Sequence, residues 1–201
     1  MSKSKSNGIA GTIIAVILMG SIIIGFYLMI TRDKKDGKLE ANVEVSEAST
    51  LLSRDLSKDY PQTPREVVKL YCRITKCLYN EDLSDSQIED MVDLLRGLYS
   101  DELLAQNPRD DMVGLVRGEI KHYQSNGRVI NSYSIDASGD IEYNRSLKPA
   151  QAVVDIYFTI KEGAEFNRAY EEIMLTEAET NKWKIVGWRE SKDTSLKPEE
   201  D

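Results

Sequence analysis

The feature that most constrains this chain is a stretch of 23 residues without a charge, from Gly8 to Ile30. As a helix rising about 1.5 Å per residue it would be about 34 Å long, enough to cross a hydrocarbon core of about 30 Å. A buried core helix would usually carry a polar edge, whereas this stretch has Thr12 and Ser21 as its only small polar residues. We therefore predict a transmembrane helix over residues 8–30, preceded by a short tail of residues 1–7.

A cleaved signal peptide is the main alternative for this stretch. Signal peptides have an apolar region of about 7–15 residues followed by a small-x-small cleavage site. The stretch in this chain is longer and ends in the bulky residues 26–30, FYLMI, where such a site is absent. The sequence thus favours an uncleaved helix, with the lipid bilayer as its partner.

The orientation of the predicted helix is less constrained. Basic residues stand on both sides of it: Lys3, Lys5, Arg32, Lys34, Lys35 and Lys38. The positive-inside rule barely discriminates between the two orientations and leans slightly toward a cytoplasmic domain. A short lysine-flanked start before a long apolar run is nevertheless typical of a signal anchor, and long domains translocate largely regardless of charge. We expect a single-pass protein of the cell membrane whose soluble domain is extracytoplasmic.

The charge of the rest of the chain argues against nucleic acid as a partner. The formal net charge is −8 at pH 7, and because the residues before Leu39 are net basic, the remainder is more acidic still. Affinity for a phosphate backbone requires clustered lysine and arginine. An acidic surface of this kind serves solubility.

Residues 31–59 are polar and read as a linker or stalk, with a short helix possible over residues 46–56. Residues 63–66, TPRE, then combine an N-cap, a proline at the first helical position and a capping-box glutamate. Three amphipathic helices follow, because apolar residues recur at helical spacing. Their predicted inward stripes are Val67, Leu70, Tyr71, Ile74, Cys77 and Leu78; Ile88, Met91, Val92, Leu95 and Leu98; and Met112, Leu115, Val116, Ile120 and Tyr123.

From Arg128 the period of the pattern changes from 3.6 to 2, which indicates strands. The first reads as Arg128–Ile135, with an extension through Gly139 to Tyr143 as the alternative. Residues 152–160, 165–178 and 182–189 supply the others, joined by short turns. Consecutive strands with short turns predict an antiparallel meander of about four strands with the helices on one face. The fold class is therefore α+β, with the domain at residues 60–192 and an acidic disordered tail at 193–201.

This order of elements resembles the nuclear transport factor 2-like superfamily, which includes ketosteroid isomerase and polyketide cyclases of the SnoaL type. The matching residues are 63–68 (TPREVV), 152–154 (AVV) and 183–185 (WKI), and the resemblance covers about Pro61 to Glu190. It implies a cone, with a curved sheet wrapped around helices. The membrane helix before such a domain also resembles uncharacterised, membrane-anchored bacterial families, which implies a cell-envelope setting. The fold hosts both enzymes and inert binding modules, so it selects no activity.

No catalytic or metal-binding constellation stands out. Asp155 and Tyr157 alternate with the apolar residues of their strand and should point away from the helices. His122 is the single histidine and reads as a surface residue near a helix end, and Glu119 reads as a helix-rim residue. No catalytic residue, metal ligand or cofactor is predicted.

The two cysteines, Cys72 and Cys77, lie five residues apart on a predicted helix. That spacing is neither a zinc pattern nor a workable disulfide. Both read as buried free thiols.

Aromatic residues are the remaining candidates for a site. Tyr71, Tyr99 and Tyr123 lie on or near inward helix stripes, and Trp183 and Trp188 lie in the last strand. Core packing accounts for them. The alternative is that together they line a cavity or a protein-binding groove, with Tyr71, Tyr99, Tyr123 and Trp183 as the cavity candidates.

Two hypotheses about function follow. The first is a non-catalytic, membrane-anchored module that binds or assembles with other envelope proteins or with a second copy of itself, through the open face of the sheet. The alternative is a small-molecule-binding protein or enzyme that uses the interior of the cone. Sensing or regulatory roles take what remains, although the seven-residue tail leaves little room for a cytoplasmic output.

Overall fold

The computed structural model of the chain describes residues 46–191. Outside these residues lie the predicted transmembrane helix over residues 8–30, the tails at 1–7 and 193–201, and most of the linker. Among the helices of residues 46–191, none is long and apolar enough to cross a membrane.

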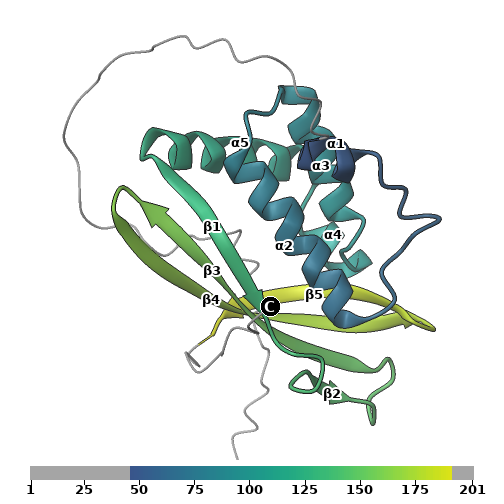
Figure 1. Cartoon of the computed structure of the whole chain (residues 1–201). Coiled ribbons are helices and arrows are strands. Elements are labelled where there is room, and N and C mark those ends of the chain that lie inside the picture. The colour runs from purple at the N-terminus through teal and green to yellow at the C-terminus, as the bar shows by residue number, and fades with distance from the viewer. Residues whose placement is uncertain (1–45, 192–201) are drawn as a thin grey trace, which may run out of the picture.

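The described part of the chain begins with five helices and continues with five strands (Figure 1). The helices are α1 (Glu47–Leu52), α2 (Pro64–Asn80), α3 (Asp85–Arg96), α4 (Asp101–Gln106) and α5 (Arg109–Ser125). The three long helices are the predicted ones. The other two, α1 and α4, have six residues each, and α1 lies within residues 46–56, where a short helix is predicted as possible. Six residues are too few for an amphipathic stripe to be distinctive.

The central helix, α2, begins where the sequence predicts. The Thr63 hydroxyl accepts a hydrogen bond from the Glu66 amide, and the Glu66 carboxylate accepts one from the Thr63 amide, each at 3.2 Å. This capping box satisfies two backbone donors that the first helical turn leaves open. The predicted stripe of α2 is buried throughout, and so are Val68, Cys72 and Tyr79 on other sides of the helix. Neighbours therefore surround α2.

One position on α5 differs from the prediction. The stripe buries Val113 beside Met112, Val116, Ile120 and Tyr123, whereas Leu115 has 44% of its surface exposed. At roughly 100° per residue, Leu115 lies more than 90° from the centre of the buried stripe. The prediction took an apolar residue as inward without testing its angle.

The strands are β1 (Arg128–Ile135), β2 (Glu142–Asn144), β3 (Gln151–Glu162), β4 (Glu165–Glu179) and β5 (Lys182–Glu190). Their order in the sheet is β1-β3-β4-β5, every pairing is antiparallel, and β2 pairs with β3 beyond the end of β1. The sheet thus has five strands where about four are predicted. Instead of continuing through Gly139, β1 ends at Ile135, and the chain re-enters the sheet as the three-residue strand β2.

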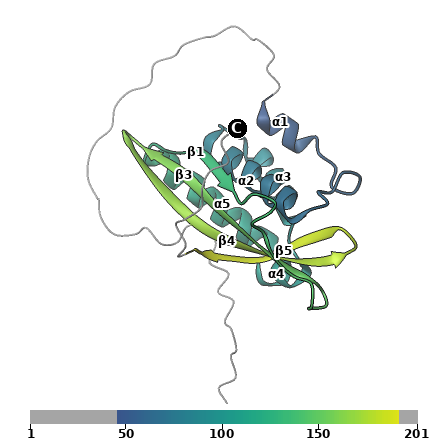
Figure 2. The same ribbon diagram turned by 60° about the horizontal axis from the view of Figure 1, so that its bottom comes forward.

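The helices cover one face of the sheet, and the core lies between the two layers (Figures 1 and 2). On β3, the predicted inward residues Ala152, Val154, Ile156, Phe158 and Ile160 are all buried. The register between β1 and β3 shifts once, and that between β4 and β5 shifts twice. Such bulges bend strands, and the long strands curve beneath the helices in Figure 1.

Candidate functional site

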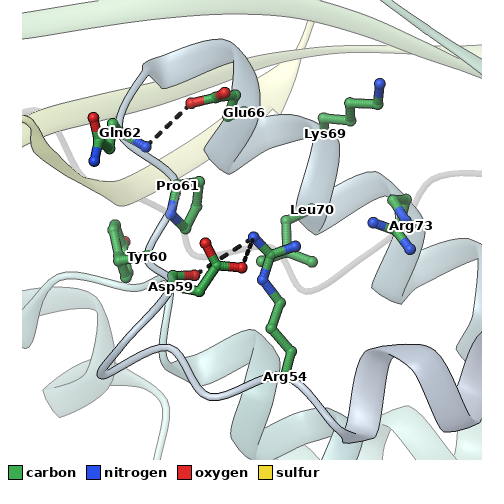
Figure 3. Close-up of a pocket in the computed structure, with 9 residues that line it drawn as sticks. All are labelled: Arg54, Asp59, Tyr60, Pro61, Gln62, Glu66, Lys69, Leu70 and Arg73. Carbon is green, nitrogen blue, oxygen red and sulfur yellow. Dashed lines mark hydrogen bonds and ion pairs between the residues drawn. The ribbon is translucent and has the colours of Figure 1, made fainter.

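A surface groove of about 400 Å³ lies between the segment that joins α1 to α2 and the first turns of α2 (Figure 3). Its lining comprises Arg54, Asp59, Tyr60, Pro61, Gln62, Glu66, Lys69, Leu70 and Arg73. A neighbouring hollow of about 360 Å³ shares Arg54, Asp59 and Arg73 with the groove. The two hollows therefore form one polar depression beside α1.

Most charged side chains in the groove already have partners. Arg54 pairs with Asp59 at 3.0 Å, and Arg73 pairs with Glu47 at 2.8 Å. Glu66 caps the helix and also accepts a hydrogen bond from the Gln62 amide at 3.1 Å (Figure 3). Lys69 is exposed and forms no ion pair within residues 46–191. The groove can recognise polar groups, but it presents no activated nucleophile with an adjacent base.

A buried acid lies on the opposite side of α2, on the inner face of the sheet. Glu171 alternates with Ile173 and Leu175 along β4, so all three side chains face the helices. Only 7% of Glu171 is exposed, and its Oε2 atom has no hydrogen-bond partner in the described part of the chain. Burial raises the pKa of its carboxyl from the ordinary 4.5 to about 7. Across the strands it is paired with Ile156 and Glu190.

Two of the predicted aromatic residues lie near this acid. Tyr71 and Tyr99 both contact Trp188, with ring centroids 6.2 Å and 5.8 Å apart. Both phenols are fully buried, and neither hydroxyl has a hydrogen-bond partner within residues 46–191. Burial raises the pKa of both hydroxyls, and the negative charge of Glu171 raises both values further. The positive charge of Arg96 acts in the opposite direction on the pKa of Tyr99.

The backbone explains why Tyr99 reaches the sheet. The Ser100 amide donates to the Ile185 carbonyl, and the Ile185 amide donates to the Leu98 carbonyl, both at 2.9 Å. The segment after α3 therefore adds to the free edge of β5 as a short parallel bridge at Tyr99. This pairing fixes the Tyr99 side chain next to Trp188.

The other two predicted residues lie elsewhere. Tyr123 packs on Tyr79, with ring centroids 4.6 Å apart, and the Tyr79 hydroxyl donates a hydrogen bond to Glu119. Trp183 packs edge-on against Tyr143, and its carbonyl accepts a hydrogen bond from Tyr60 at 2.7 Å. The four candidates thus divide among three aromatic clusters, so they do not line one cavity together.

Glu171 is the residue that the sequence prediction missed. Its signal was present, because residues 171, 173 and 175 alternate in a strand and place the glutamate on an apolar face. Trp188, considered in the sequence with the other aromatic residues, contacts Glu171's neighbours Tyr71 and Tyr99. A charged residue at a strand position that should be apolar is the feature to look for.

Asp155 and Tyr157 point away from the helices, as predicted. Tyr157 packs on Tyr170 with centroids 5.3 Å apart, and the Arg168 guanidinium lies 4.9 Å from the Tyr157 ring centroid. Asp155 is joined to Asp136 through two hydrogen bonds that involve its backbone. Both residues belong to the outer side of the sheet.

The remaining predictions concern His122, Glu119 and the cysteines. His122 is exposed near the end of α5, where its carbonyl accepts from Asn126 at 2.7 Å. Burial raises the pKa of the half-buried Glu119, whereas its hydrogen bond from Tyr79 lowers it. Cys72 and Cys77 are buried and free, as predicted. Within residues 46–191, no group of three histidine, cysteine or acidic side chains is arranged to hold a metal ion.

Helices on one face of an antiparallel five-stranded sheet, with an acid and aromatic residues between the layers, define an α+β domain with a partly polar core. The chain belongs to the family described as Domain of unknown function (DUF6715), whose model matches residues 1–188. Among curated proteins and solved structures, no significant match to the chain was found.

Proposed function

We propose that this protein is a membrane-anchored, non-catalytic module that binds or assembles with partners at the bacterial cell envelope. The uncharged stretch at residues 8–30 supplies the anchor, and the polar residues after it supply the stalk. The family match spans this stretch together with the domain, which supports treating the two as one functional unit. The domain is placed outside the cytoplasm, as the signal-anchor pattern favours.

The contact surface in this proposal is the outer face of the sheet, defined by Asp155, Tyr157, Thr159 and Lys161 of β3 and Phe166, Arg168, Tyr170 and Glu172 of β4. Tyr157 is only 4% exposed, so the other seven residues present the surface. The observation that carries the proposal is the one-sided layering, because no described helix covers this face (Figures 1 and 2). A face that combines aromatic rings with both signs of charge has the composition of a protein contact surface.

The apolar end of the outer face lies at the β3–β4 turn. Phe166 is the most exposed large apolar side chain among residues 46–191, at 58%. It lies opposite Lys161, which in turn lies opposite the exposed Val129 of β1. Two apolar side chains on one rim of an otherwise polar face favour docking of an envelope protein or of a second copy of this chain.

The finer architecture in this proposal is a cone of the nuclear transport factor 2-like type. Its support is the order of helices before strands, the curved antiparallel sheet and the central, largely buried α2. Membership of the nuclear transport factor 2-like superfamily is proposed from the fold alone, and a shared fold implies no activity.

Site-specific photocrosslinking in intact membranes tests the contact surface. A photoreactive phenylalanine analogue in place of Phe166 should give a discrete adduct, either with one partner or with a second copy. The same analogue in place of Leu115, which is 44% exposed on α5, is the control and should give none. Uncrosslinked monomer from both variants, or the same adducts from both, would contradict the proposal.

A second candidate function, small-molecule binding inside the cone, is favoured by one observation. The buried polar atoms of Glu171, Tyr71 and Tyr99 have no partners within residues 46–191. Buried polar atoms are nearly always hydrogen-bonded. A ligand or internal water is the usual way in which such atoms are satisfied.

A further inference from the structure

Three of the unmatched polar atoms of the core come from three separate elements. Glu171 Oε2 comes from β4, Tyr71 Oη from α2, and Tyr99 Oη from the segment that pairs with β5. All three side chains are more than nine-tenths buried. Three elements that each bring an unpartnered oxygen into one part of the core indicate a partner supplied from outside residues 46–191.

The chemistry of these atoms defines that partner. An ionised carboxylate only accepts hydrogen bonds, and a phenolic oxygen also accepts them. Burial is the sole cause that raises the pKa of Glu171, so no described lysine or arginine acts as its counter-charge. Glu190, directly across from Glu171 on β5, is exposed and acidic, so it supplies no counter-charge either. The missing partner is therefore a hydrogen-bond donor with a positive charge.

We propose that Glu171, Tyr71 and Tyr99 bind the primary ammonium group of a small amine. A primary ammonium carries three N–H donors, which match the three unpaired acceptors. The rings of Tyr71 and Tyr99 each contact the ring of Trp188, and both tyrosines lie within electrostatic range of the acid. Aromatic faces attract cations. The site is distinct from the outer face of the sheet, so it does not depend on the proposed envelope contact.

Trp188 provides the means of observation. It contacts both fully buried tyrosines but is itself only half-buried, so it extends from the polar cluster toward the surface. The chain has two tryptophans. In a Trp183→Phe background, Trp188 is therefore the only indole, and its fluorescence reports on its surroundings.

The experiment titrates the full-length Trp183→Phe protein, held in a neutral detergent near pH 8, with n-butylammonium. We expect a saturable change in Trp188 fluorescence. The response to n-butanol, which lacks the charge, and to tetramethylammonium, which lacks N–H donors, should be weaker by about tenfold or more. Glu171→Gln should reduce the apparent affinity to a similar extent, and Tyr99→Phe should reduce it several-fold.

The matched control is Glu172→Gln, because Glu172 is the next residue of β4, faces outward and pairs with Arg189. This variant should bind n-butylammonium as the parent does. The proposal would be overturned if the fluorescence response is absent or does not saturate. It would also be overturned if the response persists in Glu171→Gln or is lost equally in Glu172→Gln. None of these outcomes bears on the crosslinking at Phe166, so the two proposals fail separately.

Discussion

Glu171 is the residue whose position is hardest to reconcile with stability alone. An unpaired polar atom in a protein interior costs about 1–3 kcal/mol, and more when it is charged. The ionisable groups within electrostatic range of Glu171 are Tyr71, Cys72 and Tyr79 of α2, Tyr99 before α4 and Tyr123 of α5. Its neighbour on β5 is the exposed Glu190. None of these side chains is cationic. The folded protein therefore favours the protonated acid, and ionisation acts against the fold.

This imbalance predicts the pH dependence of stability. Because folding raises the pKa of Glu171 from 4.5 to about 7, the stabilising contribution of the bound proton is complete below about pH 4.5. It is lost as the pH rises through about 7. Glu171→Gln should therefore raise the free energy of unfolding at pH 8, by up to the order of 3 kcal/mol, and change it little at pH 5. Urea unfolding at the two pH values measures this.

Glu172→Gln is again the control, and it should keep the pH dependence of the parent. Equal stability of Glu171→Gln and the parent at pH 8 would show that the folded protein already compensates the charge of Glu171. An amine that stays bound during purification could supply this compensation. The protein is therefore dialysed before the measurement.

At the scale of single elements, local signals located the helices and the main strand. The capping box at Thr63 and Glu66 fixed the start of α2, and the alternation along residues 152–160 fixed the inward face of β3. Non-local pairings left no such signal. The three residues of β2 and the bridge between Tyr99 and Ile185 depend on partners far along the chain. The Glu171 cluster depends on them too, which is why its members could not be assembled from the sequence.

The capping box gives a prediction at this scale. Thr63→Ala removes the hydroxyl that accepts from the Glu66 amide and should lower the free energy of unfolding by about 1 kcal/mol. Gly114→Ala on α5 should raise it by about 0.5–1 kcal/mol, because a Cβ there meets no atom within 4 Å and glycine disfavours a helix. Urea titration followed by tryptophan fluorescence would detect both changes. If both variants had the same midpoint urea concentration of unfolding as the parent, this account would be contradicted.

At the scale of the whole molecule, the α+β layering is observed, whereas the membrane anchor is proposed. The layering follows from helices and strands whose periods are legible in the sequence. The proposed anchor rests on the length of an uncharged stretch and on the cost of leaving it in water. Both the proposed envelope role and the use of the outer face depend on that anchor, because it would bring the domain beside a bilayer.

The most direct test is fractionation of bacterial cells that express the full-length chain, followed by alkaline washing of the membranes. The unprocessed protein should remain in the membrane pellet. Protease added to intact protoplasts should digest the domain. A variant that lacks residues 8–30 should move to the soluble fraction. Recovery of the unprocessed, full-length protein in the aqueous fraction without detergent would contradict the account.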